Sequence, residues 1–189
     1  MKQGLLIVIS GPSGVGKDTV IRRLLQMDSN LMYSVSGTTR KPRPGEKPDE
    51  NYTFLTRQEF EDLVAKGAFL EHASYDGNLY GTFRDRVERT RLAGRDMVLK
   101  IEVNGAEQVH ELMPDAILIF VVAPSEEELR HRQEQRGSES ADDLAARRKI
   151  AEKEMTYASH YDHVVTNDDV DRAAGEILAL IRKARASQT

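Results

Sequence analysis

The sequence predicts an α/β protein with a parallel β-sheet flanked by helices. Short apolar, β-branched runs typical of buried strands recur along the 189 residues, at 5–9, 97–101, 117–122 and 163–165. Segments with helical periodicity lie between and after these runs, at 17–27, 57–66, 105–112, 125–136, 142–159 and 170–185. Strands that alternate with helices usually pair in parallel and are covered on both faces, which favours this architecture.

The first strand leads directly into the glycine-rich run GPSGVGKDT. Its glycines allow backbone angles that a Cβ would obstruct, so main-chain N–H groups can surround phosphate oxygens. The following helix adds the partial positive charge of its N-terminus, and Lys17 can reach the β- and γ-phosphates. This pattern predicts a P-loop NTPase fold rather than a turn that merely caps a helix. The predicted ATP-binding residues are Gly11, Pro12, Ser13, Gly14, Val15, Gly16, Lys17, Asp18 and Thr19.

One position of the loop departs from the usual pattern, which has a hydroxyl after the lysine. Asp18 stands there instead. The usual hydroxyl ligates Mg²⁺. A carboxylate could do so too, but it would bring negative charge near the phosphates, whereas Thr19 offers a hydroxyl one residue later. We therefore expect Mg²⁺ with ATP, held by Thr19 or Asp18.

Composition limits the classes of protein that remain. A chain of 189 residues with 31% charged residues fits one soluble domain with small insertions, and its net charge of −4 argues against a nucleic-acid partner. There is no cysteine, so disulfides and cysteine zinc sites are excluded. The first apolar run is too short for a signal peptide, and no segment is apolar enough for a membrane span. We expect a cytoplasmic protein without a membrane partner, either a monomer or a homo-oligomer.

Two stretches differ from the predicted core in composition and hydrophobic pattern. Residues 34–82 contain short alternating segments separated by Pro- and Gly-rich turns, which predicts a small, mostly β insertion. Residues 130–158 are helical in pattern and rich in Arg, Glu and Asp, so they predict a lid rather than a core layer. The core of this single domain is expected at 1–33, 83–129 and 159–189.

The first insertion contains a basic loop. Arg40 and Arg43 lie three residues apart in a proline-stiffened segment and could both bind one phosphate. The phenols of Tyr52 and Tyr80 could complete that site. The alternative is a solvated basic loop or a nucleic-acid patch. Because a P-loop is also present, a second anion site is the favoured interpretation.

With these motifs the chain resembles the guanylate kinases, P-loop kinases of nucleoside monophosphates, over essentially its whole length. The resemblance is carried by GPSGVGKDT, SVSGTTRKPRPGE at 34–46, NYTF at 51–54, FLEHASYDGNLYGT at 69–82, IEVNGA at 101–106, HRQEQRG at 131–137 and TNDD at 166–169. It implies transfer of the γ-phosphoryl group of ATP to GMP, and to dGMP, giving ADP and GDP in purine nucleotide metabolism.

The resemblance also implies roles for individual residues. Those for the phosphate of GMP are Arg40, Arg43, Tyr52 and Tyr80, and those around guanine are Ser36, Glu71, Thr82 and Glu102. The catalytic set is Lys17, Arg40 and the lid arginines Arg132, Arg136 and Arg147. The guanine roles make chemical sense, because a carboxylate can accept from both N1–H and the 2-amino group, and a hydroxyl can donate to O6. From residue type alone, a surface charge at a strand edge would be the favoured interpretation of Glu71, and the resemblance reverses that order.

Two departures and two alternatives stay open at this point. Besides Asp18, Lys100 stands where many family members carry the first of two acids, and it could approach a substrate phosphate or pair with Glu102. The chain could be an inactive interaction module of the same fold, although such modules typically lose the loop lysine and glycines that this chain keeps. It could also phosphorylate another small molecule, such as a ribose bisphosphate. The guanine-side residues argue against that activity.

Overall fold

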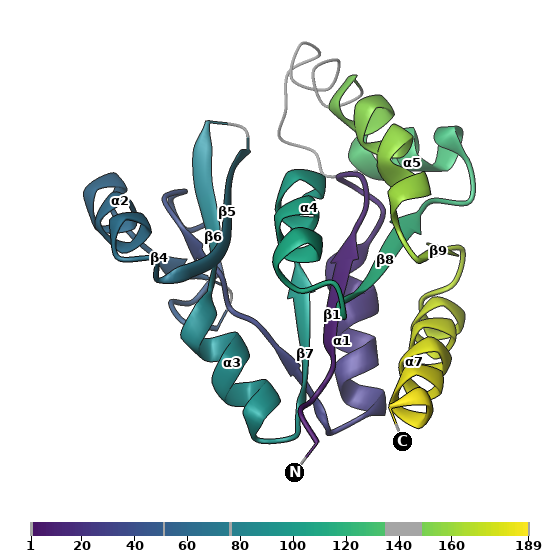
Figure 1. Ribbon diagram of the computed structural model, residues 1–189. Helices are drawn as coiled ribbons and strands as arrows, with labels where there is room; N and C mark the ends of the chain where they lie inside the picture. The colour runs from purple at the N-terminus through teal and green to yellow at the C-terminus, as the bar shows by residue number, and fades with distance from the viewer. Residues whose placement is uncertain (1, 51, 76, 135–148, 189) are drawn as a thin grey trace. The chain divides into compact units, whose positions relative to one another are not determined.

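The computed structural model describes residues 2–50, 52–75, 77–134 and 149–188, which form two compact units (Figure 1). The first unit comprises Met1–Leu6 and Asn30–Ala116, and the second comprises Ile7–Ser29 and Ile117–Thr189. Within the described ranges, no helix is both long and apolar enough to cross a membrane. The limits of a core, a GMP-binding insertion and a lid stay a prediction.

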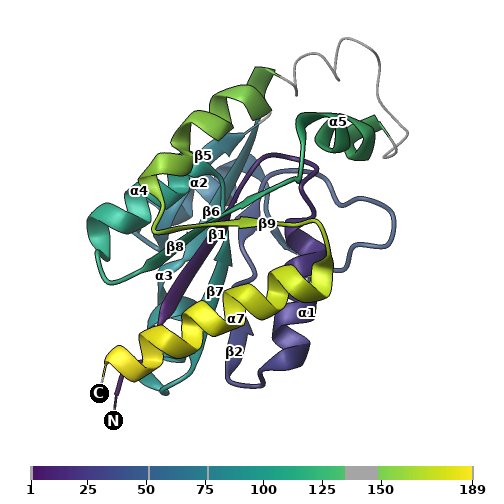
Figure 2. The same cartoon turned by 90° about the vertical axis from the view of Figure 1, so that its right-hand side faces the viewer.

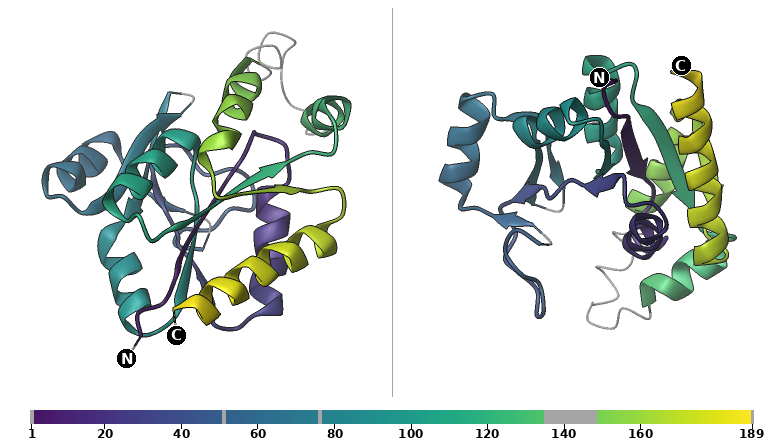
Figure 3. Two further views of the ribbon diagram at one scale, coloured as in Figure 1. Left: turned by 45° about the vertical axis from the view of Figure 1, so that its right-hand side comes forward. Right: turned by 90° about the horizontal axis from the view of Figure 1, so that it is seen from below.

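The second unit is built on parallel strands. β8 (Ile117–Val122) pairs with β1 (Leu6–Ser10) on one side and with β9 (His163–Thr166) on the other. α1 (Lys17–Met27) and α7 (Val170–Ser187) lie side by side (Figures 2 and 3) and bury their apolar faces. The remaining described elements are α5 (Glu126–Glu134), a helical segment at 149–155 and the 3₁₀ turn η1 (Thr156–His160).

The first unit contains a small sheet of its own with the strand order β4-β3-β6-β5. Its strands are β3 (Gly37–Thr38), β4 (Thr53–Phe54), β5 (Phe69–Tyr75) and β6 (Asn78–Phe83). Phe60, Phe69 and Phe83 form a buried cluster of this unit, with Phe60 contributed by α2 (Arg57–Ala65). The same unit holds the parallel pair β2 (Leu31–Tyr33) and β7 (Asp96–Lys100), with α3 (Arg84–Leu92) and α4 (Val103–Leu112).

The predicted fold class is confirmed. The register is parallel for β2 with β7 in the first unit, and for β1 with β8 and β8 with β9 in the second. All five residues of β1 are buried, and β8 is buried over its four central residues, as expected for strands covered on both faces. The apolar runs of the sequence therefore predicted β1, β7, β8 and β9 to within one residue at each end, whereas β2 was not predicted.

One helix was not predicted from the sequence. α3 has the sequence RDRVERTRL, in which apolar residues are few, and its Leu92 is 66% exposed. The helix is anchored by Val87 and by Arg91, which is 3% exposed. The Arg91 guanidinium donates to the carbonyl of Gly4 at 2.8 Å and forms an ion pair with Asp115. Because a buried arginine takes the place of an apolar residue, the usual helical periodicity is missing.

Candidate active site

The glycine loop between β1 and α1 depends on residues without side chains. Gly11, Gly14 and Gly16 have φ values of 143°, 98° and 90°, in the region that side chains rarely adopt. A Cβ on Gly14 would lie 2.8 Å from Cγ of Gln133, and one on Gly16 would lie 2.6 Å from Nδ2 of Asn167. Both the backbone angles and the neighbouring side chains therefore require glycine.

Lys17 occupies the first turn of α1 and is 9% exposed. Its ammonium group donates to the carbonyl oxygen of Gly11 and, at 3.2 Å, to that of Pro12. The cation is thus held within the loop and beside the N-terminus of α1. Phosphate oxygens are attracted to both features.

Two amide side chains that the sequence analysis assigned no role support this loop. Nε2 of Gln133 donates to the carbonyl of Ser13 at 2.8 Å, and Nδ2 of Asn167 donates to that of Val15 at 2.7 Å. Both residues are 4% exposed. Neutral amides give no charge pattern in a sequence, although Gln133 and Asn167 lie within the stretches that carried the resemblance.

Arg132, predicted as a lid arginine, lies at the same loop. It projects from α5, forms an ion pair with Glu128 at 2.7 Å and donates to the carbonyl of Asn167 at 3.1 Å. Arg136 and Arg147 lie outside the described residues. Asp18 and Thr19, the predicted magnesium ligands, are both exposed in the first turn of α1.

The basic loop of the first unit is organised by a carboxylate that the sequence analysis did not single out. Glu46 receives two hydrogen bonds from the Arg40 guanidinium, at 2.9 and 3.0 Å, and one from the Arg43 main-chain N–H at 2.7 Å. These hydrogen bonds raise the pKa of Arg40 and lower the pKa of Glu46. Two sequence signals were available: Glu46 ends the stretch at 34–46 that carried the resemblance, and it lies three residues after Arg43, where an acid can close a turn.

Three of the four predicted phosphate-binding residues of the first unit lie together, namely Arg40, Tyr52 and Tyr80. The guanidinium carbon of Arg40 is 5.3 Å from the centre of the Tyr52 ring, and the rings of Tyr52 and Tyr80 are 6.0 Å apart in an edge-on arrangement. Burial is the main cause of a raised pKa of Tyr80, so its hydroxyl keeps a proton to donate. The fourth residue, Arg43, is exposed and lies three residues after Arg40 in the basic loop.

The predicted guanine-binding carboxylate is buried. Glu71 on β5 is 4% exposed and lies opposite Thr82 on β6, whose hydroxyl donates to Oε1 of Glu71 at 2.6 Å. Burial raises the pKa of Glu71 to about 7, although the hydrogen bonds of Thr82 oppose this shift. The surface-charge interpretation of Glu71 is therefore wrong, even though β5 is an edge strand.

The remaining predicted guanine residues belong to the same unit. Ser36 is 7% exposed and directly precedes β3, while Glu102 is the N-cap residue of α4. The negative charge of Glu102 adds to the raised pKa of Glu71, which indicates that the two carboxyl groups are near each other. Two carboxylates that lie this near each other could accept hydrogen bonds from the N–H groups of one base.

The absence of a side chain at Gly105, in the first turn of α4, leaves room for the Glu71 carboxylate. A Cβ at residue 105 would lie 2.4 Å from Oε2 of Glu71. We expect Gly105→Ala to displace that carboxylate and raise KM for GMP about tenfold, with KM for ATP unchanged. Steady-state kinetics with each substrate varied would measure this. Gly175→Ala is the matched control, because a Cβ there meets open space, and equal KM values in both variants would contradict the expectation.

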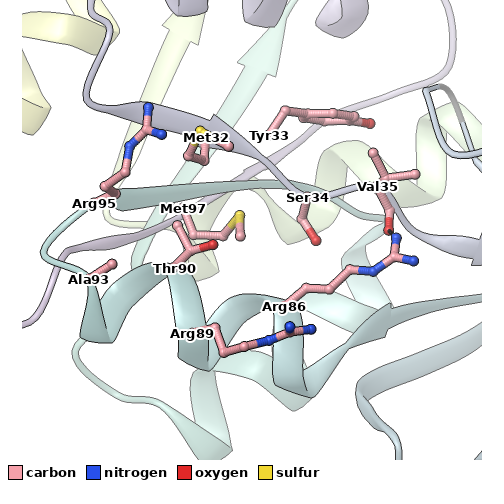
Figure 4. A pocket seen from close by; sticks show the side chains of 10 residues that line it. All are labelled: Met32, Tyr33, Ser34, Val35, Arg86, Arg89, Thr90, Ala93, Arg95 and Met97. Carbon is pink, nitrogen blue, oxygen red and sulfur yellow. Dashed lines mark hydrogen bonds between the residues drawn. The ribbon is translucent and has the colours of Figure 1, made fainter.

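A separate pocket of about 410 Å³ lies between β2, α3 and β7 (Figure 4). Its walls include the side chains of Met32, Arg86, Arg89 and Met97. None of the ten lining residues is among the predicted nucleotide-binding residues.

A glycine loop that encloses a buried lysine, between a strand of a parallel sheet and a helix, defines a nucleotide-binding protein of the P-loop class. The family model described as Guanylate kinase matches residues 3–184. The chain belongs to the guanylate kinase family, which confirms the resemblance seen in the sequence.

Individual relatives cover nearly the whole chain. The guanylate kinase of Rubrobacter xylanophilus is 48% identical over 97% of this chain and 96% of its own length. That of Caldanaerobacter subterraneus is 46% identical over 95% of this chain and 87% of its own length. Among solved structures, the guanylate kinase from Anaplasma phagocytophilum superimposes with a TM-score of 0.81 at 36% identity, over 96% of this chain and 86% of that one.

Proposed function

We propose that this protein transfers the γ-phosphoryl group of ATP to GMP and dGMP, giving ADP and GDP in purine nucleotide metabolism. The observation that carries the assignment of the acceptor is the buried pair of Glu71 and Thr82, in the same unit as a cluster of arginine and tyrosine side chains. Membership of the guanylate kinase family supports the activity. Cytoplasmic location and the absence of a nucleic-acid partner stay predictions.

The acceptor side divides into two parts. We assign the phosphate of GMP to Arg40, Arg43, Tyr52 and Tyr80, because guanidinium groups and phenols donate to phosphate oxygens without titrating near neutral pH. We assign guanine to Ser36, Glu71, Thr82 and Glu102. An ionised Glu71 would accept from N1–H and the 2-amino group, and adenine offers neither donor in that arrangement.

The donor side is the glycine loop with Lys17. Main-chain N–H groups of the loop would bind the ATP phosphates, and Lys17 would neutralise charge on the transferring group. Arg132 already contacts this loop, and we assign the same neutralising role to it and to Arg136 and Arg147. The acceptor oxygen belongs to a phosphate whose second pKa is about 6, so no strong general base is needed. Catalysis then consists of positioning, charge neutralisation and exclusion of water.

The residues next to the loop fit a magnesium ion. Asp18 and Thr19 place a carboxylate and a hydroxyl on the exposed first turn of α1, and Mg²⁺ prefers one or two such protein ligands together with substrate phosphates and waters. The ion, when bound with ATP, would supply charge neutralisation to the phosphates.

The unusual Asp18 can be tested by Asp18→Ser. If Asp18 contributes to metal binding, we expect the Mg²⁺ concentration for half-maximal activity to rise about tenfold, because a carboxylate binds Mg²⁺ more strongly than a hydroxyl does. A titration of the initial rate with Mg²⁺ at saturating ATP would measure this. Thr19→Val is the companion variant, and an unchanged titration for Asp18→Ser would assign the ligand to Thr19 or to water.

The proposed function is tested by an ADP-release assay with GMP, dGMP, AMP, CMP and UMP as acceptors. We expect activity with GMP and dGMP and little with the others, because only guanine pairs with Glu71. Activity that is equal with AMP would overturn the guanine assignment. Absence of activity with every acceptor would favour the inactive interaction module.

A further inference from the structure

Lys100 lies beside the cluster that we assign to the acceptor phosphate. It is the last residue of β7, and its ammonium nitrogen is 5.5 Å from the centre of the Tyr52 ring. The Arg40 guanidinium lies 5.3 Å from the centre of the same ring. A lysine and an arginine are therefore held next to one tyrosine, within one unit of the structure.

The neighbouring charges show what a further cation would add to this cluster. Both oxygens of Glu46 accept hydrogen bonds from Arg40, and one of them also accepts from the Arg43 N–H. The Arg40–Glu46 pair can direct N–H groups at a ligand, but its net charge is zero. A phosphate monoester carries close to two negative charges above a pH of about 6. Lys100 adds a further positive charge beside this pair.

We propose that Lys100 is a further residue that binds the acceptor phosphate and selects its dianion. The proposal rests on the proposed acceptor site, since it takes Tyr52 and Arg40 as phosphate ligands. Of the two possibilities that the sequence left open, the proposal takes the phosphate. The Tyr52 ring holds the lysine beside the phosphate position through a cation–π contact.

The test compares GMP with guanosine, which has the same base and no phosphate. Dissociation constants at pH 8 would be measured by calorimetry for wild type, Lys100→Met and Lys100→Arg. We expect Lys100→Met to weaken GMP binding about tenfold, with guanosine unchanged, and Lys100→Arg to restore GMP binding. Lys66→Met is the matched control, because it removes an exposed lysine of the same unit with the same change in total charge.

The outcomes separate this proposal from the acceptor site on which it rests. Unchanged GMP binding in Lys100→Met, or an equal loss for GMP and guanosine, would overturn the role of Lys100. An equal loss would show that the lysine merely packs against Tyr52. Glu71→Gln is measured in parallel and should weaken both ligands. If it weakens neither, the acceptor site itself is wrong, whatever Lys100 does.

Discussion

Replacing Lys17 with alanine is expected to abolish turnover while the protein stays folded. Among the described residues of the loop, Lys17 is the one buried cation. It lies at the N-terminus of α1, where the negative charge of a bound triphosphate would lie. Loss of a group that neutralises the transferring phosphoryl should lower kcat by about 10³-fold or more. The measurement is ADP release at saturating ATP and GMP.

The fold must be checked separately in this variant, because Lys17 also donates to two loop carbonyls. Thermal unfolding and far-ultraviolet circular dichroism would show whether the fold survives. Lys66→Met serves again as a control for the loss of one positive charge. A folded Lys17→Ala protein with kcat near that of wild type would reject the assignment of this loop as the ATP site.

Glu71→Gln is expected to remove most of the preference for GMP over AMP. The ionised carboxylate can accept from two guanine donors at once, whereas a glutamine amide offers one acceptor and turns a competing donor toward the base. Two charge-assisted hydrogen bonds in a buried site correspond to about 10²- to 10³-fold in the ratio of kcat/KM values. The ratio would be measured with GMP and AMP under identical conditions.

The controls for this variant follow from its neighbours. Thr82→Val removes the hydrogen bond to Glu71 but keeps the carboxylate, so its ratio should lie between wild type and Glu71→Gln. KM for ATP should stay constant in both. A GMP-to-AMP ratio that does not move in Glu71→Gln would remove this residue from base recognition.

The raised pKa of Glu71 gives the same variant a pH signature. In the folded protein without a nucleotide, burial raises the pKa of the Glu71 carboxyl group to about 7. Only the ionised form of this group can accept hydrogen bonds from both guanine donors. KM for GMP should therefore fall as pH rises from about 6 to 8 in wild type. Glu71→Gln should lose this part of the dependence. Ionisation of the GMP phosphate affects both proteins equally, so the ratio of their KM values isolates Glu71.

The stability of the protein should respond in the opposite direction. Burial makes the folded state hold the Glu71 proton more tightly than the unfolded chain, whose pKa is near the ordinary value of 4.5. This contribution to stability is fully present below pH of about 4.5 and is lost as pH rises through about 7. Unfolding free energies measured across this range should fall less with pH in Glu71→Gln than in wild type.

The fold could be predicted where residues close together in the sequence all indicate the same local structure. β1 and the loop after it combine a buried apolar run, glycines and a lysine in one continuous segment, so no distant contact was needed to recognise them. α3 was missed because its anchor, Arg91, depends on Gly4 and Asp115, which are far from it in sequence. A charged residue that is buried by long-range partners has no local signature.

The same distinction applies to the candidate site. Arg40, Tyr52 and Tyr80 were selected from a basic loop and its phenols, and the structure brings them together. Glu46 was not selected, although it holds Arg40 in place. Its role depends on how the loop folds back on itself, and a short turn can place an acid near an arginine or away from it. Residues that hold a binding residue in place are therefore harder to predict than the binding residue itself.

The hydrogen bond from Asn167 to Val15 also has a consequence for biosynthesis. The two residues are separated by 152 positions, and β1 pairs with β8, which is itself far along the chain. A ribosome makes the chain from its N-terminus, so the glycine loop emerges long before the side chain that supports it. The loop can therefore take the conformation described above only after Asn167 has left the ribosome.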